Sequence, residues 1–74
     1  MTVTNEIQDK YVLLSSREKE ILAAIVDAKK TREIAQMLCI SPNTVEVHRA
    51  QVMKKMGMRS LAQLVTTVVK YDLI

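Results

Sequence analysis

Apolar residues recur every three or four positions along most of the chain, which is the spacing of one face of an α-helix. The first such run follows Ser15. Ser15 and Glu18 form a capping box, in which the hydroxyl and the carboxylate each accept a hydrogen bond from an otherwise unpaired backbone N–H. Ile21 and Ile25 lie on the apolar face of this run, and we expect the helix to end near Ala28.

Two further helices are separated by a short turn. Thr31 is the expected N-cap of a helix of about two turns. Cys39-Ile40 must form a turn, because Ser41-Pro42 begins a new helix: serine caps it, and proline loses no hydrogen bond at the first helical position. This third helix should span residues 42–56, since Gly57 favours the left-handed conformation that ends a helix.

A fourth helix should begin after Ser60, which forms a second box with Gln63. Its expected core stripe contains Leu61, Leu64, Val65 and Val68. Residues 1–13 carry a weaker pattern, with apolar side chains such as Ile7 that can pack on the domain. This segment is therefore either a packed lead-in or a linker. The chain is short enough for one domain only, so residues 14–74 are expected to form an all-α, four-helix domain.

The third helix has an unusual outer face when it is drawn as a helical wheel. Its core side is formed by Val45, Val52, Met53 and Met56. The residues roughly opposite are Asn43, Glu46, Val47, Ala50 and Lys54. A solvated helix face normally carries long charged side chains, whereas the short side chains here allow a close approach to a partner. The pattern indicates a binding face.

A short helix, a turn and a longer helix form the helix-turn-helix layout, in which the second helix enters the major groove of DNA. Val47 or Ala50 would then touch a thymine methyl group. Glu46 would accept a hydrogen bond from the cytosine N4 amine, and Asn43 would bond to adenine. The alternative is that Val47 and Ala50 are two scattered surface residues, which are common in soluble proteins.

The positive charge of the chain gathers in the same region. The net charge is +3. Between Ser41 and Ser60 one acid, Glu46, accompanies four cations, and four minus one equals the excess of the whole chain. The cations expected to contact phosphates are Lys54, Lys55 and Arg59. The N-terminus of the second helix, at Thr31-Arg32, is a further expected phosphate site.

Composition argues against several other classes of protein. There is one Gly, one Pro, no Trp and no Phe, which favours helices over a small β-barrel. A single cysteine, Cys39, allows no internal disulfide and no cysteine metal cluster, and His48 has no partner at ligand spacing. We find no nucleophile–base set and no Gly-rich phosphate loop, so we expect no enzyme, no cofactor and no metal. No signal peptide, membrane segment or room for a ligand pocket is evident, which favours a cytoplasmic protein.

Four stretches and the last helix resemble known sequences. They are Leu14–Leu22 (LSSREKEIL), Arg32–Ala35 (REIA), Ile40–His48 (ISPNTVEVH), Lys54–Gly57 (KKMG) and the helix after Ser60. Their order and spacing are similar to those of LuxR-type (NarL/FixJ-like) DNA-binding domains over about residues 13–74. The resemblance implies a four-helix fold, promoter binding and dimerisation through the fourth helix. It implies base contacts from Glu46, Val47 and Ala50, and phosphate contacts from Thr31, Asn43, Thr44, His48, Lys54 and Lys55.

The chain departs from this family at three places. The family often has glycine at the positions of Ala28 and Cys39, so the ends of the first two helices need either another cap or a strained left-handed residue. Many members have lysine at the position of Glu46 and a basic residue at that of Ala50. The lower positive charge should weaken non-specific binding to DNA.

The fourth helix has a second weakly charged face beside its core stripe. The residues expected in a dimer interface are Ala62, Val65, Thr66 and Val69. A two-fold partner would place two recognition helices about 34 Å apart, one turn of DNA. The alternative is that Val69 covers Tyr11 or Val12 of the lead-in.

Several side chains have a structural interpretation beside a functional one. Arg49 lies towards the core side of the wheel, and we expect its stem to be buried and its head paired with Glu18 or Glu20. The Arg17, Glu18 and Glu20 group is either a solvated face or an ion pair to a neighbouring helix. The methionines, Met37 among them, are expected core residues.

The leading interpretation is a sequence-specific transcription regulator that binds double-stranded DNA as a homodimer on an inverted repeat. Members of this family are usually fused to a receiver or ligand-sensing domain, so the chain is either a short regulator or an output domain. RNA polymerase is a further candidate partner. The competing interpretation is an interaction module that binds another regulator or the polymerase through the fourth helix.

Overall fold

The computed structural model describes residues 3–74, with side chains from Glu6 onwards, and this part of the chain contains five helices and no strand. The helices are α1 (Val3–Val12), α2 (Ser16–Val26), α3 (Thr31–Leu38), α4 (Pro42–Met56) and α5 (Leu61–Lys70). Helices α2 to α5 confirm the all-α fold with four domain helices. Helix α1 was not predicted: within the segment 1–13 that the sequence left open, residues 3–12 are helical, and residues 1 and 2 lie outside the described part.

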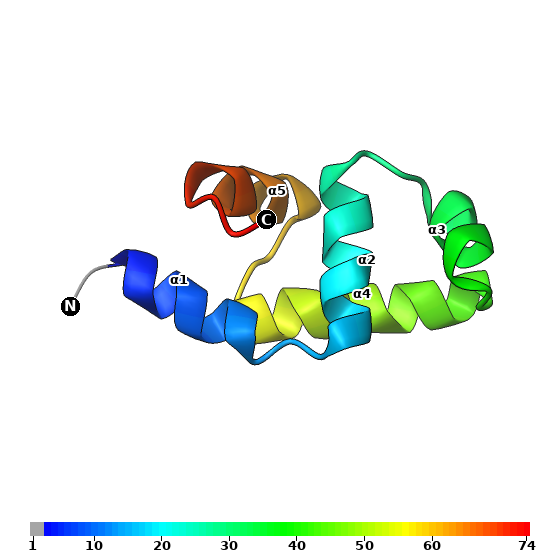
Figure 1. Cartoon of the computed structure of the whole chain (residues 1–74), viewed down its shortest axis with the longest axis horizontal. Helices are drawn as coiled ribbons and strands as arrows, with labels where there is room; N and C mark the ends of the chain where they lie inside the picture. The colour runs from blue at the N-terminus through cyan, green and yellow to red at the C-terminus, as the bar shows by residue number, and fades with distance from the viewer. Residues whose placement is uncertain (1–2) are drawn as a thin grey trace.

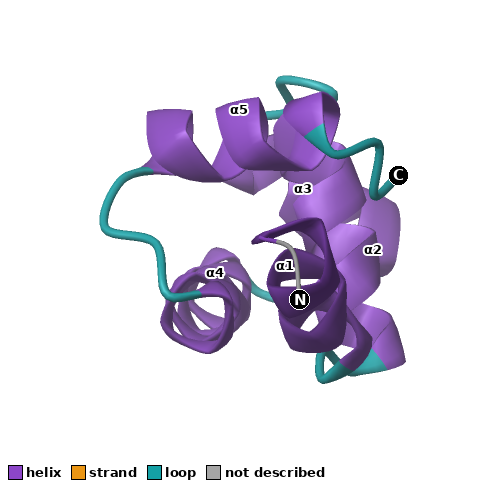
Figure 2. Cartoon of the chain, turned by 90° about the vertical axis from the view of Figure 1, so that its left-hand side faces the viewer, coloured by secondary structure: helices purple, strands orange, loops and turns teal. Residues whose placement is uncertain are grey.

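Helix α4 is the longest, and the other helices are arranged along it (Figure 1). Helix α3 packs near the beginning of α4, α2 crosses its middle, and α1 lies beside its end and runs in the opposite direction. Figure 2, viewed along α4, shows α1 next to α4 and α5 passing across the other helices. The molecule is therefore elongated, with extents of 39 × 19 × 19 Å.

The core consists of two apolar clusters, and α4 contributes to both. One cluster contains Ile7, Leu14, Leu22, Val52, Met56, Leu64 and Val68. The other contains Ile21, Ala24, Ile25, Ile34, Ala35 and Val45. Val45, Val52 and Met56 have no exposed surface, and Met53 is half-buried beside them. The predicted core stripe of the helix at 42–56 is therefore confirmed, and close packing at three points along α4 fixes its rotation about its axis.

Helix α1 joins the first cluster through Ile7, which is buried, and Tyr11 packs against the same cluster. Lys19 of α2 lies over the Tyr11 ring, 5.1 Å from its centroid, which adds a cation–π contact between the two helices. Val12 is exposed at the end of α1. The segment therefore packs on the domain. Val69 is 64% exposed and Val12 63% exposed, which does not favour the alternative that Val69 covers the lead-in.

Serine side chains begin three of the helices as expected. Ser15 forms the complete capping box with Glu18, and the hydroxyls of Ser41 and Ser60 accept from backbone N–H groups of α4 and α5. The predicted cap of α3 is wrong by one residue. Lys30 occupies the N-cap position and Thr31 is the first helical residue. The backbone N–H of Lys30 donates to the Glu33 carboxylate at 2.8 Å, which is the acid's half of a capping box.

The helices α2 to α5 all end in the same way. In each, a residue with left-handed backbone follows the helix, and the next N–H bonds back to a carbonyl five residues earlier. The four left-handed residues are Ala28, Cys39, Gly57 and Asp72, with φ of 61°, 57°, 69° and 53°. Ala28 and Cys39 thus keep the geometry expected of glycine, and the chain retains the backbone strain instead of another turn.

Helices α2 and α4 are joined by an ion pair between the buried Glu18 and Lys55, whose side chain is 39% exposed. Glu18 is 3% exposed, and its Oε1 accepts from the Lys55 Nζ at 2.7 Å and from the backbone N–H of Ser15 at 2.8 Å. These hydrogen bonds, the lysine first, lower the pKa of the Glu18 carboxyl below its ordinary value of 4.5, although burial opposes them. Of the two interpretations of this acid, the ion pair to a neighbouring helix is confirmed.

We expect Ala28→Gly to raise the melting temperature by about 2–8 °C. Removing the Cβ relieves roughly 1–2 kcal/mol of left-handed strain, of which about 0.5–1 kcal/mol is offset by the entropy of glycine in the unfolded chain. Ala23→Gly in the interior of α2 is the matched control, and it should lower stability by about 1 kcal/mol. Thermal unfolding followed by circular dichroism measures both, and a lower melting temperature for Ala28→Gly would contradict the strain assignment.

The ionisation of Glu18 makes the free energy of unfolding depend on pH. Because its pKa is lower in the folded chain, the unfolded chain takes up this proton first as pH falls. The stabilisation is complete above about pH 4.5 and is lost as pH falls through the folded pKa. We expect Glu18→Gln to lower stability by about 1–3 kcal/mol at neutral pH and to narrow its difference from the wild type in acid. The control is Glu20→Gln, whose partner Arg17 is exposed and 3.6 Å away. An equal loss in both variants would refute the ion pair with Lys55.

Candidate nucleic-acid interface

The outward face of α4 is set by what the helix buries. Because Val45 has no exposed surface, the next two residues, Glu46 and Val47, turn towards solvent. Val47 is 56% exposed, and Ala50 is exposed one turn further along. The predicted base-reading residues thus share one open surface. The side chains at the centre of this surface, Val47 and Ala50, are short and apolar, and no described side chain covers them.

The N-terminus of α3 adjoins this surface. Unlike in α2, α4 and α5, the N-cap side chain accepts no hydrogen bond here; the Glu33 carboxylate accepts from the N–H of Lys30 and leaves the first-turn N–H groups unpaired. The first-turn N–H groups of an α-helix have no intrahelical partner, and they favour a negative charge. Thr31 and Arg32 occupy the first two positions, with Arg32 exposed. This end of α3 therefore keeps backbone donors that an anionic group can use.

A polar network connects the two helices across this surface. The Thr31 hydroxyl donates to Glu46 Oε2 at 2.6 Å. The Arg49 Nη1 donates to Thr31 Oγ1 at 2.9 Å and to Glu46 Oε2 at 3.1 Å. The expected pairing of Arg49 with Glu18 or Glu20 is therefore wrong. Arg49 does keep its stem half-buried, with its side chain 28% exposed, but its head turns to the acid one helical turn before it.

The beginning of α4 holds the other polar residues expected at phosphates. Asn43 is exposed in the first turn. Thr44 is half-buried, and its hydroxyl lies 2.8 Å from that of the N-cap Ser41. His48 is half-buried with its Nδ1 buried and unpaired, so a contact from this ring to a phosphate would use Nε2. The structure thus brings Asn43 to the surface most directly.

The cations of α4 are less available than the sequence suggests. Lys55 is bonded to the buried Glu18, and Arg49 is bonded to Glu46. Lys54 is exposed next to Lys55, and Arg59 is exposed just beyond the helix; among the described residues neither has an acid within ion-pair distance. Of the four cations between Ser41 and Ser60, two therefore already have an acid as partner.

The second face of α5 is open. Ala62, Thr66 and Val69 are exposed, while Val65 is half-buried against the second core cluster. Leu61, which was expected in the core stripe, is 39% exposed and lies beside this face, because the core contacts of α5 pass through Leu64 and Val68. The predicted dimer residues are thus exposed or half-buried, and no described segment covers the exposed ones.

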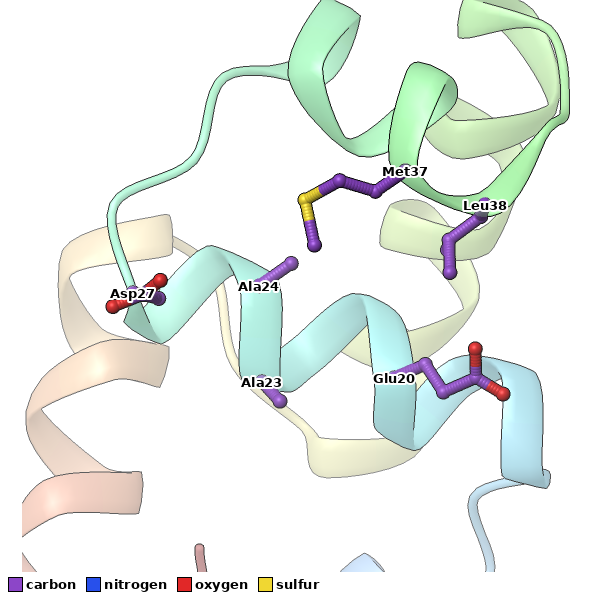
Figure 3. Close-up of a pocket in the computed structure, with 6 residues that line it drawn as sticks. All are labelled: Glu20, Ala23, Ala24, Asp27, Met37 and Leu38. Atoms are coloured by element: carbon purple, nitrogen blue, oxygen red, sulfur yellow. The ribbon is translucent and has the colours of Figure 1, made fainter.

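The structure also has a groove between α2 and α3, apart from the predicted DNA-contact residues. It is lined by Glu20, Ala23, Ala24, Asp27, Met37 and Leu38, and Figure 3 shows Met37 reaching from α3 towards Ala24. None of the predicted DNA-contact residues lines it. Met37 is 58% exposed, so its expected place in the core is wrong.

Two broader observations describe residues 3–74. No three metal-ligating side chains gather in this part of the chain. None of its helices combines the length and the apolar character needed to cross a membrane.

Comparison with known proteins matches residues 12–68 to the family described as "Bacterial regulatory proteins, luxR family". Over 61 residues the chain is 49% identical to the transcriptional regulatory protein FixJ of Rhizobium meliloti (strain 1021), covering 82% of this chain and 30% of that protein. Over 71 residues it is 38% identical to the oxygen regulatory protein NreC of Staphylococcus aureus (strain bovine RF122 / ET3-1), covering 96% of this chain and 33% of that one.

Among solved structures, full-length FixJ from B. japonicum superposes with a TM-score of 0.88 at 33% identity, covering 97% of this chain and 36% of that chain. The chain thus spans about a third of the length of these relatives. The matched segment contains all of α2, α3 and α4, with the open face of α4 and the N-terminus of α3. The fold, the motifs and the matched residues agree: the chain belongs to the luxR family of bacterial regulatory proteins.

Proposed function

We propose that this chain is a DNA-binding transcription regulator, or the DNA-binding output part of one, and that α4 reads bases in the major groove. The observation that carries the proposal is the open face of α4. Val45, Val52 and Met56 are fully buried, which leaves Glu46, Val47 and Ala50 in the positions from which a recognition helix reaches base edges. Short apolar side chains at the centre allow the helix to approach thymine methyl groups.

Phosphate contacts would surround this face. The backbone N–H groups at Thr31 and Arg32, the exposed Asn43, and Thr44 and His48 beside it are the candidates near the beginning of α4. At the other end we assign the main electrostatic contact to Lys54. Lys55 is a weaker candidate, because its ammonium group already neutralises the buried Glu18. Lys54 lies eight residues after Glu46, about 12 Å along the helix. It would therefore contact a different phosphate from the groups near the beginning of α4.

We further propose that two chains bind together through α5. The contact would use Ala62, Val65, Thr66 and Val69, with the exposed Leu61 at its edge. A cyclic dimer with this two-fold contact would present two α4 helices to successive major grooves, so its site would be an inverted repeat with centres about 10 base pairs apart.

The direct test is selection from a random duplex library by the 74-residue chain at low salt, followed by sequencing of the bound DNA. Enrichment of an inverted repeat supports base reading by a dimer. Enrichment of single half-sites supports base reading and removes the dimer. Recovery of all sequences equally, with only salt-sensitive binding, would refute the proposed function and favour the competing interpretation, a protein-interaction module that acts through α5.

Two variants should distinguish base reading from phosphate contact. We expect Val47→Ala to change the preferred base at one position, because it removes the methyl groups that meet a thymine. Lys54→Ala should weaken binding to all duplexes alike and make the slope of log K against log salt shallower by about 0.9. Fluorescence anisotropy at several salt concentrations measures both.

Neighbouring and distant residues provide the controls. Lys55→Ala changes the charge as much as Lys54→Ala, but it should act mainly on folding stability and change the salt slope less. Lys70→Ala on α5 changes the charge away from α4 and should leave the slope unchanged. An unchanged base preference in Val47→Ala would show that Val47 is not part of the base-reading face.

The proposed dimer contact can be tested with a variant of Val69. Val69 is 64% exposed, and a two-fold contact would bury it twice, so Val69→Asn should weaken binding to paired half-sites by about tenfold or more. Affinity for a single half-site should not change, because α5 lies outside the reading face. Val47→Ala is the reciprocal control, since it should change base preference and leave the ratio of paired to single sites intact. Equal losses on both kinds of site would refute the α5 contact.

A further inference from the structure

The network of Thr31, Glu46 and Arg49 leaves one oxygen of Glu46 unused. Both protein donors bind the same atom, Oε2, at 2.6 and 3.1 Å. Among the described residues no hydrogen bond reaches Oε1. The side chain of Glu46 is nevertheless 55% exposed, on the face of α4 that also carries Val47. One carboxylate oxygen is therefore anchored to the protein, and the other is open to a donor from outside.

The network also removes two penalties for an acid beside DNA. A free carboxylate would be repelled by the phosphates, but the Arg49 guanidinium 3.1 Å away balances its charge. A free glutamate on a helix surface also loses rotamer entropy when it binds, whereas two anchoring bonds fix Glu46 beforehand. The arrangement thus has the character of a prepared single-acceptor site.

The only proton of the Thr31 hydroxyl is already used within the network. The hydroxyl donates this proton to Glu46, and its oxygen accepts from Arg49 at 2.9 Å. A DNA phosphate that meets Thr31 would therefore use its backbone N–H at the start of α3, and the side chain would serve Glu46 instead.

We propose that Thr31 and Arg49 are positioning residues that hold Glu46 as a preformed acceptor for the exocyclic amine of one cytosine in the bound DNA. Discrimination at one base pair then depends on two side chains that do not touch the base. This inference rests on the proposed function, because it requires that α4 reads bases. Glutamate accepting from cytosine N4 is the pairing that the major groove offers an acid.

The test compares single and double variants of the 74-residue chain on DNA. A duplex preferred by the wild type is first obtained by selection, and the dissociation constant is then measured for it and for each single base-pair change. Glu46→Ala should lower discrimination at one cytosine-containing pair by about tenfold. Thr31→Val and Arg49→Met should lower it at the same pair, and Thr31→Ser, which keeps the hydroxyl, should resemble the wild type.

The decisive measurement is Thr31→Val in the Glu46→Ala background. If Thr31 acts through Glu46, the second substitution has no further effect on discrimination at that base pair. An equal loss of affinity for all duplexes in both backgrounds would mean that Thr31 contacts the backbone directly, and would overturn the inference. So would unchanged discrimination in Thr31→Val and Arg49→Met.

Folding and the underlying function are checked separately. Circular dichroism and thermal unfolding report on folding, and loss of the fold in both Thr31→Val and Arg49→Met would make the network a structural tie and overturn the inference. A wild-type chain that selects no duplex removes the proposed function and this inference together. A wild-type chain that selects a duplex, with preferences that survive both substitutions, removes this inference alone.

Discussion

The rotation of α4 about its own axis is the constraint on which the rest of the molecule depends. Val45 is enclosed by the cluster that contains Ile21 and Ile34, while Val52 and Met56 are enclosed by the cluster that contains Leu22 and Leu64. Because the two clusters hold α4 at both ends, its outward residues are determined by what lies inward. A single methylene too many or too few at these positions would turn or tilt the helix. The open face is thus a consequence of core packing.

Electrostatics then divides the charged residues between structure and surface. Glu18 and Glu46 each take one cation of α4, the first in the interior and the second at the edge of the open face. The two pairs differ in what they cost to form. Desolvation of Glu18 requires its full set of donors, whereas Glu46 remains in contact with water and gains little stability from its partner. The exposed pair therefore contributes more to orientation than to folding.

Local signals in the sequence predicted the elements well. The three serine caps, the proline after Ser41 and the glycine after α4 act within four residues, so they determine helix ends without the rest of the fold. The cap of α3 was misplaced because Thr31 suits an N-cap by residue type, while Glu33 stabilises a helix that begins at Thr31. Helix α1 was left open because its packing contacts lie outside the helix: Ile7 joins the first core cluster, and Tyr11 lies against Lys19 of α2.

Side-chain pairing could be predicted only where helical spacing settles it. Glu46 lies three residues before Arg49 on the same helix, so this pair could have been predicted from helical spacing and was missed. A wheel does not show which helix lies beside Arg49, so its contact with the Thr31 hydroxyl, 18 residues earlier in the chain, could not be predicted. Lys55 and Glu18 are 37 residues apart, and nothing local joins them. The candidate surface was therefore predicted as a set of residues, whereas their division into anchored and available groups required the structure.

Under the proposed function, the same division favours selective binding of DNA by a weakly charged chain. Non-specific affinity grows with each phosphate that a cation neutralises, and α4 commits Lys55 and Arg49 to acids of its own domain. What remains at the centre of the open face of α4 is short, apolar or already hydrogen-bonded, and Lys54 is the cation of the helix that has no acid as partner among the described residues. Such a surface gains little from an arbitrary duplex and more from one whose base edges match it, because unmatched polar groups stay desolvated without partners. Low charge and fixed side chains thus act in the same direction, towards discrimination between sequences and away from affinity for DNA in general.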